Sequence, residues 1–288
     1  MSFAKILVPV TGSKNDLVAL ATAFAAAKPF NAHVRVLFSH PDPRTAIPYS
    51  GAPLAPDIVQ ELVDTEEALA KVASTEARRA LAEAAEEYGV RIVGAPEIGK
   101  TVTASYEERV GGYAACIEEA ARLCDLIIFP PLVDKTIPTL REAFLQTLIK
   151  IERPILLAGA KAPAHIGQKV AVGWDGGLAA SHALSAALPY LRTAKAVEVL
   201  SIRSVPRDSH TFEGLKEYLT LHGVSWTERL VDCGEGPVSD ALLSAAAKAD
   251  CDLLVIGGYG HSRMHETIFG GVTVDVMSHP AIPVLLMH

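Results

Sequence analysis

Two hydrophobic patterns alternate along the chain. Short uninterrupted apolar runs such as Ile6–Val10 and Leu253–Ile256 are typical of strands buried on both faces of a parallel sheet, because such strands lose the polar alternation. Longer stretches with helical spacing, such as Asp16–Ala27, lie between these runs. Regular alternation of strands with helices predicts a parallel sheet covered by helices on both faces.

In the first half the pattern predicts five strands separated by four helices. The predicted strands are Ile6–Val10, Val34–Phe38, one near Arg91–Ile98, Leu126–Pro130 and Ile155–Ala158. The predicted helices are Asp16–Ala27, a long Ala- and Glu-rich helix reaching about Tyr88, Arg109–Leu123 and Leu140–Ile151.

The same plan occurs twice. Lys5–Ser13 matches Lys169–Gly177 at an offset of 164, and Val34–Ser39 matches Val197–Ile202 at 163. Three further matches follow in the same order. Gly89-Val90 matches Gly223-Val224 at an offset of 134, Cys124–Leu126 matches Cys251–Leu253 at 127, and Pro154–Leu157 matches Pro283–Leu286 at 129. We therefore expect an α/β protein with two doubly wound five-stranded parallel-sheet domains in tandem.

The offsets also predict the domain boundaries. The first domain covers residues 1–159, a linker containing Pro and Gly covers 160–168, and the second domain covers 169–288. The fall in offset from 163 to 134 indicates about 29 extra residues after the second strand of the first half. We place this insert at about residues 40–72, where a proline-rich loop leads into the long helix.

A glycine-rich stretch follows the strand Leu253–Ile256. Gly257, Gly258 and Gly260 come directly after it, and Gly270 and Gly271 precede a segment that can start a helix. Glycines let a ligand approach backbone N–H groups, and a helix amino terminus favours anions, so this arrangement can form a phosphate cradle. Taken alone, such glycines between a strand and a helix usually form only a tight turn.

The spacing Gly257-x2-Gly260-x9-Gly270, followed by a terminal strand, resembles the nucleotide-binding signature of the universal stress protein family. The resemblance implies a Rossmann-like, adenine nucleotide alpha-hydrolase-like fold. It also implies an adenine nucleotide as ligand, ATP in the first place, with Mg²⁺ left open. Gly271 stands where ATP-binding members carry Ser or Thr, whereas Thr273 matches a family position.

Ligands of doubly wound sheets bind beyond the carboxyl ends of the strands, so the loops after the first and fourth strands of the second half should meet there. By resemblance, Asp175 lies at the ribose and Ile202 at the adenine; the alternatives are a helix-capping carboxylate and a core side chain. His261 and Arg263 supply charge to the phosphate loop or are simply solvated. The predicted nucleotide-binding set is Gly173, Trp174, Asp175, Ile202, Ile256, Gly257, Tyr259, Gly260, His261, Gly270, Gly271, Val272 and Thr273.

The first half lacks two of these features. It has Phe129-Pro130-Pro131 where the second half has the glycine loop, and proline lacks an N–H group and fixes φ. It also has Thr11 in place of Asp175. These losses predict that nucleotide binding is confined to the second half.

Charge and composition exclude several classes of function. The net charge of −7 argues against a nucleic-acid partner, and no apolar run is long enough for a membrane span. The amino terminus lacks a secretory signal, and the four cysteines show no CxxC spacing, so we expect a cytoplasmic protein with reduced thiols.

Three functions stay open. The first is a noncatalytic stress-response or regulatory protein that binds an adenine nucleotide. The second is a slow ATPase or adenylyl transferase, although no P-loop and no G-x-S-x-G or H-E-x-x-H motif is present and no catalytic or metal residue can be assigned. The third is a ligand-free interaction module.

Each half ends in a short apolar strand, and such an edge favours pairing with another edge. The resemblance to the universal stress protein family, in which the corresponding strands of two domains meet about a twofold axis, implies that these two strands pair antiparallel within the chain into a pseudo-dimer. Any homodimer would then use another surface, and the protein partner is unknown.

Overall fold

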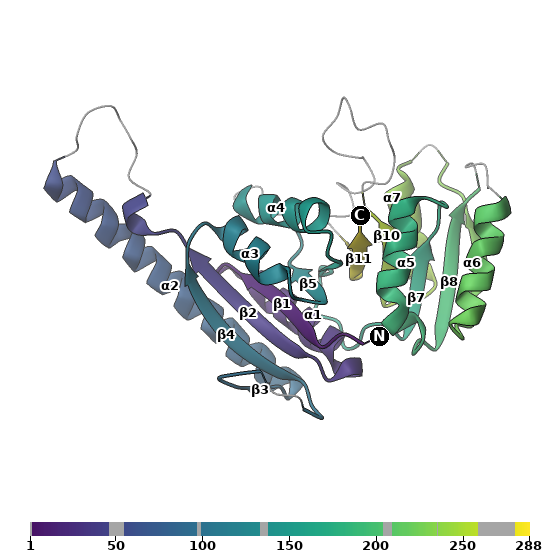
Figure 1. Ribbon diagram of the computed structural model, residues 1–288, viewed down its shortest axis with the longest axis horizontal. Helices are drawn as coiled ribbons and strands as arrows, with labels where there is room; N and C mark the ends of the chain where they lie inside the picture. Colours follow the sequence, from purple (N-terminus) through teal and green to yellow (C-terminus); the bar gives the residue numbers. More distant parts are fainter. Residues whose placement is uncertain are drawn as a thin grey trace.

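The computed structural model describes residues 2–45, 55–96, 99–132, 138–203, 209–234, 236–258 and 280–288. Its strands form one continuous sheet of eleven, in the order β3-β4-β2-β1-β5-β6-β11-β10-β7-β8-β9 (Figure 1). The elements of the first half are β1 (Lys5–Val10), α1 (Asp16–Ala27), η1 (Lys28–Phe30), β2 (His33–His40), η2 (Pro43–Thr45), α2 (Pro56–Tyr88), β3 (Arg91–Ile92), β4 (Thr103–Val110), α3 (Tyr113–Ala121), β5 (Leu126–Phe129), α4 (Pro138–Leu145), η3 (Gln146–Lys150) and β6 (Ile155–Leu157). Those of the second half are β7 (Lys169–Gly173), α5 (Leu178–Leu191), β8 (Ala196–Ile202), α6 (Ser209–Leu221), β9 (Thr227–Val231), α7 (Val238–Lys248), β10 (Leu253–Gly257) and β11 (Val284–Met287).

The two halves repeat one strand order. Reading outward from the centre, the first half runs β6, β5, β1, β2, β4 and the second runs β11, β10, β7, β8, β9. The registers also correspond, because Val8 pairs with Val36 and Val172 pairs with Val199, at the offsets of 164 and 163. Within each half all pairs are parallel, which confirms the predicted tandem of doubly wound sheets.

The halves join through the final strand of each. β6 pairs antiparallel with β11, with Leu156 opposite Leu285, and both side chains are fully buried. The predicted antiparallel pairing within the chain is therefore confirmed. Each strand is also hydrogen-bonded on its other side, β6 to β5 and β11 to β10, so neither is left as an apolar edge.

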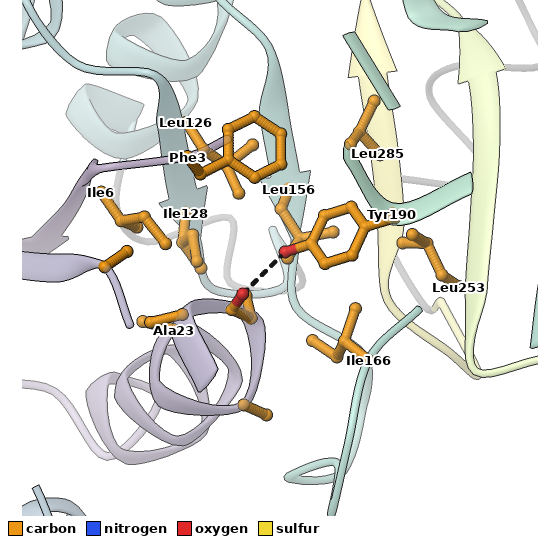
Figure 2. Close-up of a cluster of buried hydrophobic side chains, with 14 of the residues drawn as sticks. Phe3, Ile6, Ala23, Leu126, Ile128, Leu156, Ile166, Tyr190, Leu253 and Leu285 are labelled. Carbon is orange, nitrogen blue, oxygen red and sulfur yellow. Dashed lines mark hydrogen bonds between the residues drawn. The ribbon is translucent and has the colours of Figure 1, made fainter. Parts of the chain in front are cut away.

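Helices cover both faces of the sheet. Buried side chains of α1, α2, α5 and α6 form one core, and those of α3, α4 and α7 form the other. The first core crosses the junction at Tyr190, which reaches from α5 towards α1 (Figure 2). The Tyr190 ring contacts Phe3 and Phe30, and its hydroxyl donates a hydrogen bond to the Ala26 carbonyl at 3.0 Å.

Two predicted elements of the first half are wrong. The third long strand is β4 (Thr103–Val110), whereas the segment expected near Arg91–Ile98 contributes only the two-residue strand β3 at the sheet edge. As a result, the described residues of the first half form six strands instead of five. The helix expected from Arg109 begins at Tyr113, because Gly111 and Gly112 separate it from β4.

The long helix of the predicted insert is α2, which has 33 residues. It ends as expected at Tyr88, where Gly89 adopts a left-handed conformation that glycine accommodates without strain. The predicted domain boundaries themselves stay predictions.

Candidate functional site

The two loops expected to form the site follow adjacent strands. β7 pairs with β10, and both strands end at the same edge of the sheet, at Gly173 and Gly257. A Cβ at Gly173 would lie 2.9 Å from the Ile256 side chain, and one at Gly257 would lie 2.6 Å from the Ala180 nitrogen. Both glycines are thus required by close packing at this edge, where β7, β10 and the first turn of α5 converge.

The loop between β7 and α5 is a tight turn. Gly176 has φ of +79°, and the Gly177 N–H donates to Asp175 Oδ1 at 2.7 Å. One carboxylate oxygen of Asp175 therefore has the local capping role considered as an alternative. The Asp175 side chain is nevertheless exposed at the carboxyl end of β7, which places it where a ribose hydroxyl could donate to it.

The apolar members of the predicted set differ in accessibility. Ile256 is 4% exposed and belongs to the core beneath α7, so only its backbone could contact a ligand. Ile202 is half-buried at the end of β8 and packs against the same core. Trp174 packs against the opposite core, and its buried Nε1 has no hydrogen-bond partner among the described residues.

Seven predicted residues lie outside the described residues: Tyr259, Gly260, His261, Gly270, Gly271, Val272 and Thr273. Arg263 lies there as well. Their assignment stays a prediction from the sequence. Gly258, the last described residue before them, donates its N–H to the Met287 carbonyl at 2.7 Å, which fixes the start of the loop at the end of β11.

The corresponding loop of the first half contains a carboxylate that sequence reasoning missed. Gly12 has φ of +80°, the same conformation as Gly176. Here, however, the Asp16 carboxylate folds back over the loop. It accepts hydrogen bonds from the N–H groups of Thr11, at 3.1 Å, and Gly12, at 2.7 Å, and from the Thr11 hydroxyl at 3.3 Å. An internal anion thus occupies the donors of this loop.

At the offset of 164 the residue equivalent to Asp16 is Ala180. The second half therefore has a similar φ at the equivalent glycine but a methyl group where the first half has a carboxylate. Ala180 is buried in the first turn of α5, against Gly257. This difference could have been found from the repeat by comparing the helices as well as the loops.

Burial dominates the electrostatics around Asp16. The carboxylate is 1% exposed, and burial raises its pKa from 3.8 to about 6, although the hydrogen bonds from Thr11 and Gly12 act in the opposite direction. The nearby Tyr113 hydroxyl is also buried, and burial together with the negative charge of Asp16 raises its pKa well above the ordinary value. The Tyr113 phenol is therefore neutral beside Asp16.

Helix α2 packs against the same loop and against the end of β4. Ser74 and Arg78 both donate to Glu108 on β4, at 2.9 and 3.1 Å, and the Arg78 guanidinium lies 3.8 Å from the centre of the Tyr106 ring. A Cβ at Gly12 would lie 2.5 Å from the Ala73 carbonyl oxygen. In the first half the loop is therefore closed by α2 as well as filled by Asp16.

Within the described part of the chain, no group of three or more His, Cys, Asp or Glu side chains is placed to hold a metal ion. Among the same residues, none of the helices has the length and apolar character needed to cross a membrane.

The fold and the position of the glycine loop define a tandem doubly wound α/β protein with its candidate site at the carboxyl edge of the sheet. The model of the universal stress protein family matches residues 2–129 and 167–288, and the chain belongs to this family. The two matched ranges show that two such domains stand in tandem.

Solved structures share the fold. A universal stress protein from Archaeoglobus fulgidus DSM 4304 is 16% identical, with a TM-score of 0.65, and the match covers 98% of this chain and 97% of that one. A protein of unknown function from Pseudomonas aeruginosa PAO1 is 18% identical, with a TM-score of 0.56, and the match covers 99% of this chain and 92% of that one. The comparison with curated proteins gave no significant match.

Proposed function

We propose that the second half binds an adenine nucleotide, ATP in the first place, and that the chain acts as a noncatalytic regulatory protein of the stress response. One observation carries this proposal: Asp16 accepts hydrogen bonds from the Thr11 and Gly12 N–H groups in the first half, whereas the equivalent position of the second half is Ala180, whose methyl group cannot accept them.

The nature of the ligand follows from the donors. Backbone N–H groups of a glycine-rich loop at the carboxyl ends of parallel strands favour a polyanion such as a triphosphate. An exposed carboxylate at Asp175 suits the hydroxyls of a ribose. The resemblance of the loop that begins at Gly257 to the family signature supports an adenine nucleotide in preference to another phosphate ester.

The experiment transfers the internal anion between the halves. Ala180→Asp should place a carboxylate over the second loop, compete with the nucleotide and reduce ATP affinity by at least about tenfold in calorimetric titration. Its matched control, Asp16→Ala, should leave both affinity and the stoichiometry of one nucleotide per chain unchanged, because α2 still packs against the Gly12 loop. Circular dichroism and thermal unfolding check that each variant keeps its fold.

Two results would contradict the proposal: two equivalent nucleotides per chain, or unchanged affinity in folded Ala180→Asp. Mass spectrometry of ligands released from the purified protein identifies the nucleotide. Turnover of ATP measured with and without Mg²⁺ separates a regulatory binding protein from a slow ATPase.

A further inference from the structure

Helix α2 extends beyond the sheet against which its second part packs (Figure 1). Its buried residues all lie between Ser74 and Ala85, whereas no residue from 56 to 72 is buried. At about 1.5 Å per residue, these seventeen residues form roughly 25 Å of helix. A helix this long in an insert needs a face that is stabilised by packing.

Residues 56–72 of α2 carry an exposed apolar stripe formed by Ile58, Leu62, Leu69 and Val72, which we call the α2 stripe. These side chains are 47%, 40%, 59% and 63% exposed. Their spacing, with Thr65 in the middle, alternates between four and three residues, which is the seam of a coiled coil. A shallow open hollow runs along one side of the stripe, lined by Asp57, Glu61 and Asp64 together with Leu69 and Val72.

The charge around the stripe is mostly negative. Residues 56–72 contain one cation, Lys71, which lies outside the e and g positions, and five carboxylates: Asp57, Glu61, Asp64, Glu66 and Glu67. In the heptad set by the stripe, Glu61 and Glu66 occupy the g and e positions that flank the seam and govern the choice of partner. A partner that covers this face must therefore combine an apolar seam with positive flanks.

We propose that the α2 stripe is a docking surface for a basic amphipathic helix of another protein. A second copy of the chain fits less well, because parallel pairing would set Glu61 of one copy against Glu66 of the other, and antiparallel pairing would still bring two acidic helices together. An anionic membrane surface would be repelled in the same way. A helix with Leu or Ile at positions a and d and Lys or Arg at positions e and g satisfies both requirements, the apolar seam and the complementary charge.

The test uses the full chain and two fluorescein-labelled synthetic peptides. Both have three heptads with Leu and Ile in the seam, but one carries Lys and the other Glu at e and g. Fluorescence anisotropy should show saturable binding of the Lys peptide that weakens as the salt concentration rises, and no binding of the Glu peptide. Hydrogen exchange should show protection of residues 57–72 when the Lys peptide binds.

A matched pair of variants separates docking from general attraction to an acidic protein. The double substitution Leu62→Glu with Leu69→Glu should lower the affinity for the Lys peptide by at least about tenfold, because the apolar seam is lost. Leu123→Glu adds a charge at an exposed leucine elsewhere, 81% exposed, and should leave the affinity unchanged. Thermal unfolding should be unaffected in both cases, since these side chains are at the surface.

The proposal is overturned if the Lys peptide does not bind, or if Leu123→Glu lowers the affinity for the Lys peptide as much as the stripe variant does. It is also overturned if sedimentation shows a dimer of the wild-type chain that the stripe variant dissociates, because a second copy would then be the occupant.

Discussion

The Asp16 carboxylate accepts a hydrogen bond from the Gly12 amide at 2.7 Å, so a side chain of the first half takes the place that we assign to a bound anion in the second. Burial of Asp16 destabilises the ionised carboxylate, because a buried carboxyl group is more stable when it is protonated. The relation between Asp16 and Gly12 therefore has consequences for stability that can be measured.

The first prediction concerns pH. The pKa of Asp16 is about 6 in the folded protein against 3.8 unfolded, so between these values the folded state binds more protons. The free energy of unfolding should therefore fall as pH rises from about 4 to 6, by up to about 3 kcal/mol from this group. Asp16→Asn should remove that contribution. Denaturant unfolding of both proteins at several pH values gives the difference, in which all other titrating groups cancel.

A difference between Asp16→Asn and the wild type that stays constant with pH, or that favours the wild type at higher pH, would contradict this prediction. The ionised carboxylate would then be stabilised by Thr11 and Gly12 more than burial destabilises it.

The second prediction concerns Tyr190 at the junction of the halves. Its buried hydroxyl donates to the Ala26 carbonyl across the junction, and Tyr190→Phe removes that bond with little change in packing. The free energy of unfolding should fall by about 1 kcal/mol. Tyr218→Phe is the control, because its hydroxyl bond to Ser185 lies at the surface and its loss should change little. Equal effects of the two substitutions would show that the Tyr190 hydroxyl adds nothing to the junction.

The third prediction rests on the proposed function. Gly271→Ser restores the hydroxyl position of ATP-binding relatives and should strengthen ATP binding by about 0.5–1.5 kcal/mol, the contribution of one hydrogen bond. Calorimetric titration measures the change. Gly236→Ser, at an exposed glycine elsewhere in the second half, should leave the affinity unchanged. Unchanged affinity in Gly271→Ser itself would show that this position does not face the phosphates.

The sequence predicted the parts of the fold that depend on apolar runs and repeats. β1 and β7 are such runs, and their offset of 164 also holds in the registers with β2 and β8. The strand β4 was missed because its second part, Glu107 to Val110, is polar. Tertiary contacts such as the ion pair of Arg35 with Glu107, at 3.1 Å, stabilise it instead of a buried pattern.

The sequence indicates where the candidate site lies but not the arrangement of the side chains around it. The glycines and Asp175 indicate the carboxyl edge of β7 and β10, because topology places both loops there. The direction of the Asp16 side chain does not follow from its place at the start of a helix, where a carboxylate could equally remain in solvent. Likewise, that Gly257 is required by packing against Ala180 follows only from the way α5 docks on the sheet.

The last prediction concerns the pairing of β6 with β11. Because one sheet runs through both halves, we expect them to unfold together. Both tryptophans, Trp174 and Trp226, belong to the second half, so their fluorescence reports on that half, whereas far-ultraviolet circular dichroism reports on the whole chain. In wild-type protein the two signals should change at the same denaturant concentration.

Leu156→Ala changes the first half alone, at a fully buried residue opposite Leu285. It should lower the free energy of unfolding by about 2–5 kcal/mol and shift the tryptophan transition by the same amount as the dichroism. Combined with Leu285→Ala it should show a coupling energy of about 0.5 kcal/mol or more, because the two side chains face each other across the strands. When Leu156→Ala is combined with Leu81→Ala, in α2, the effects of the two substitutions on the free energy of unfolding should add. If Leu156→Ala left the tryptophan fluorescence transition at its wild-type denaturant concentration, the two halves would unfold independently despite the shared sheet.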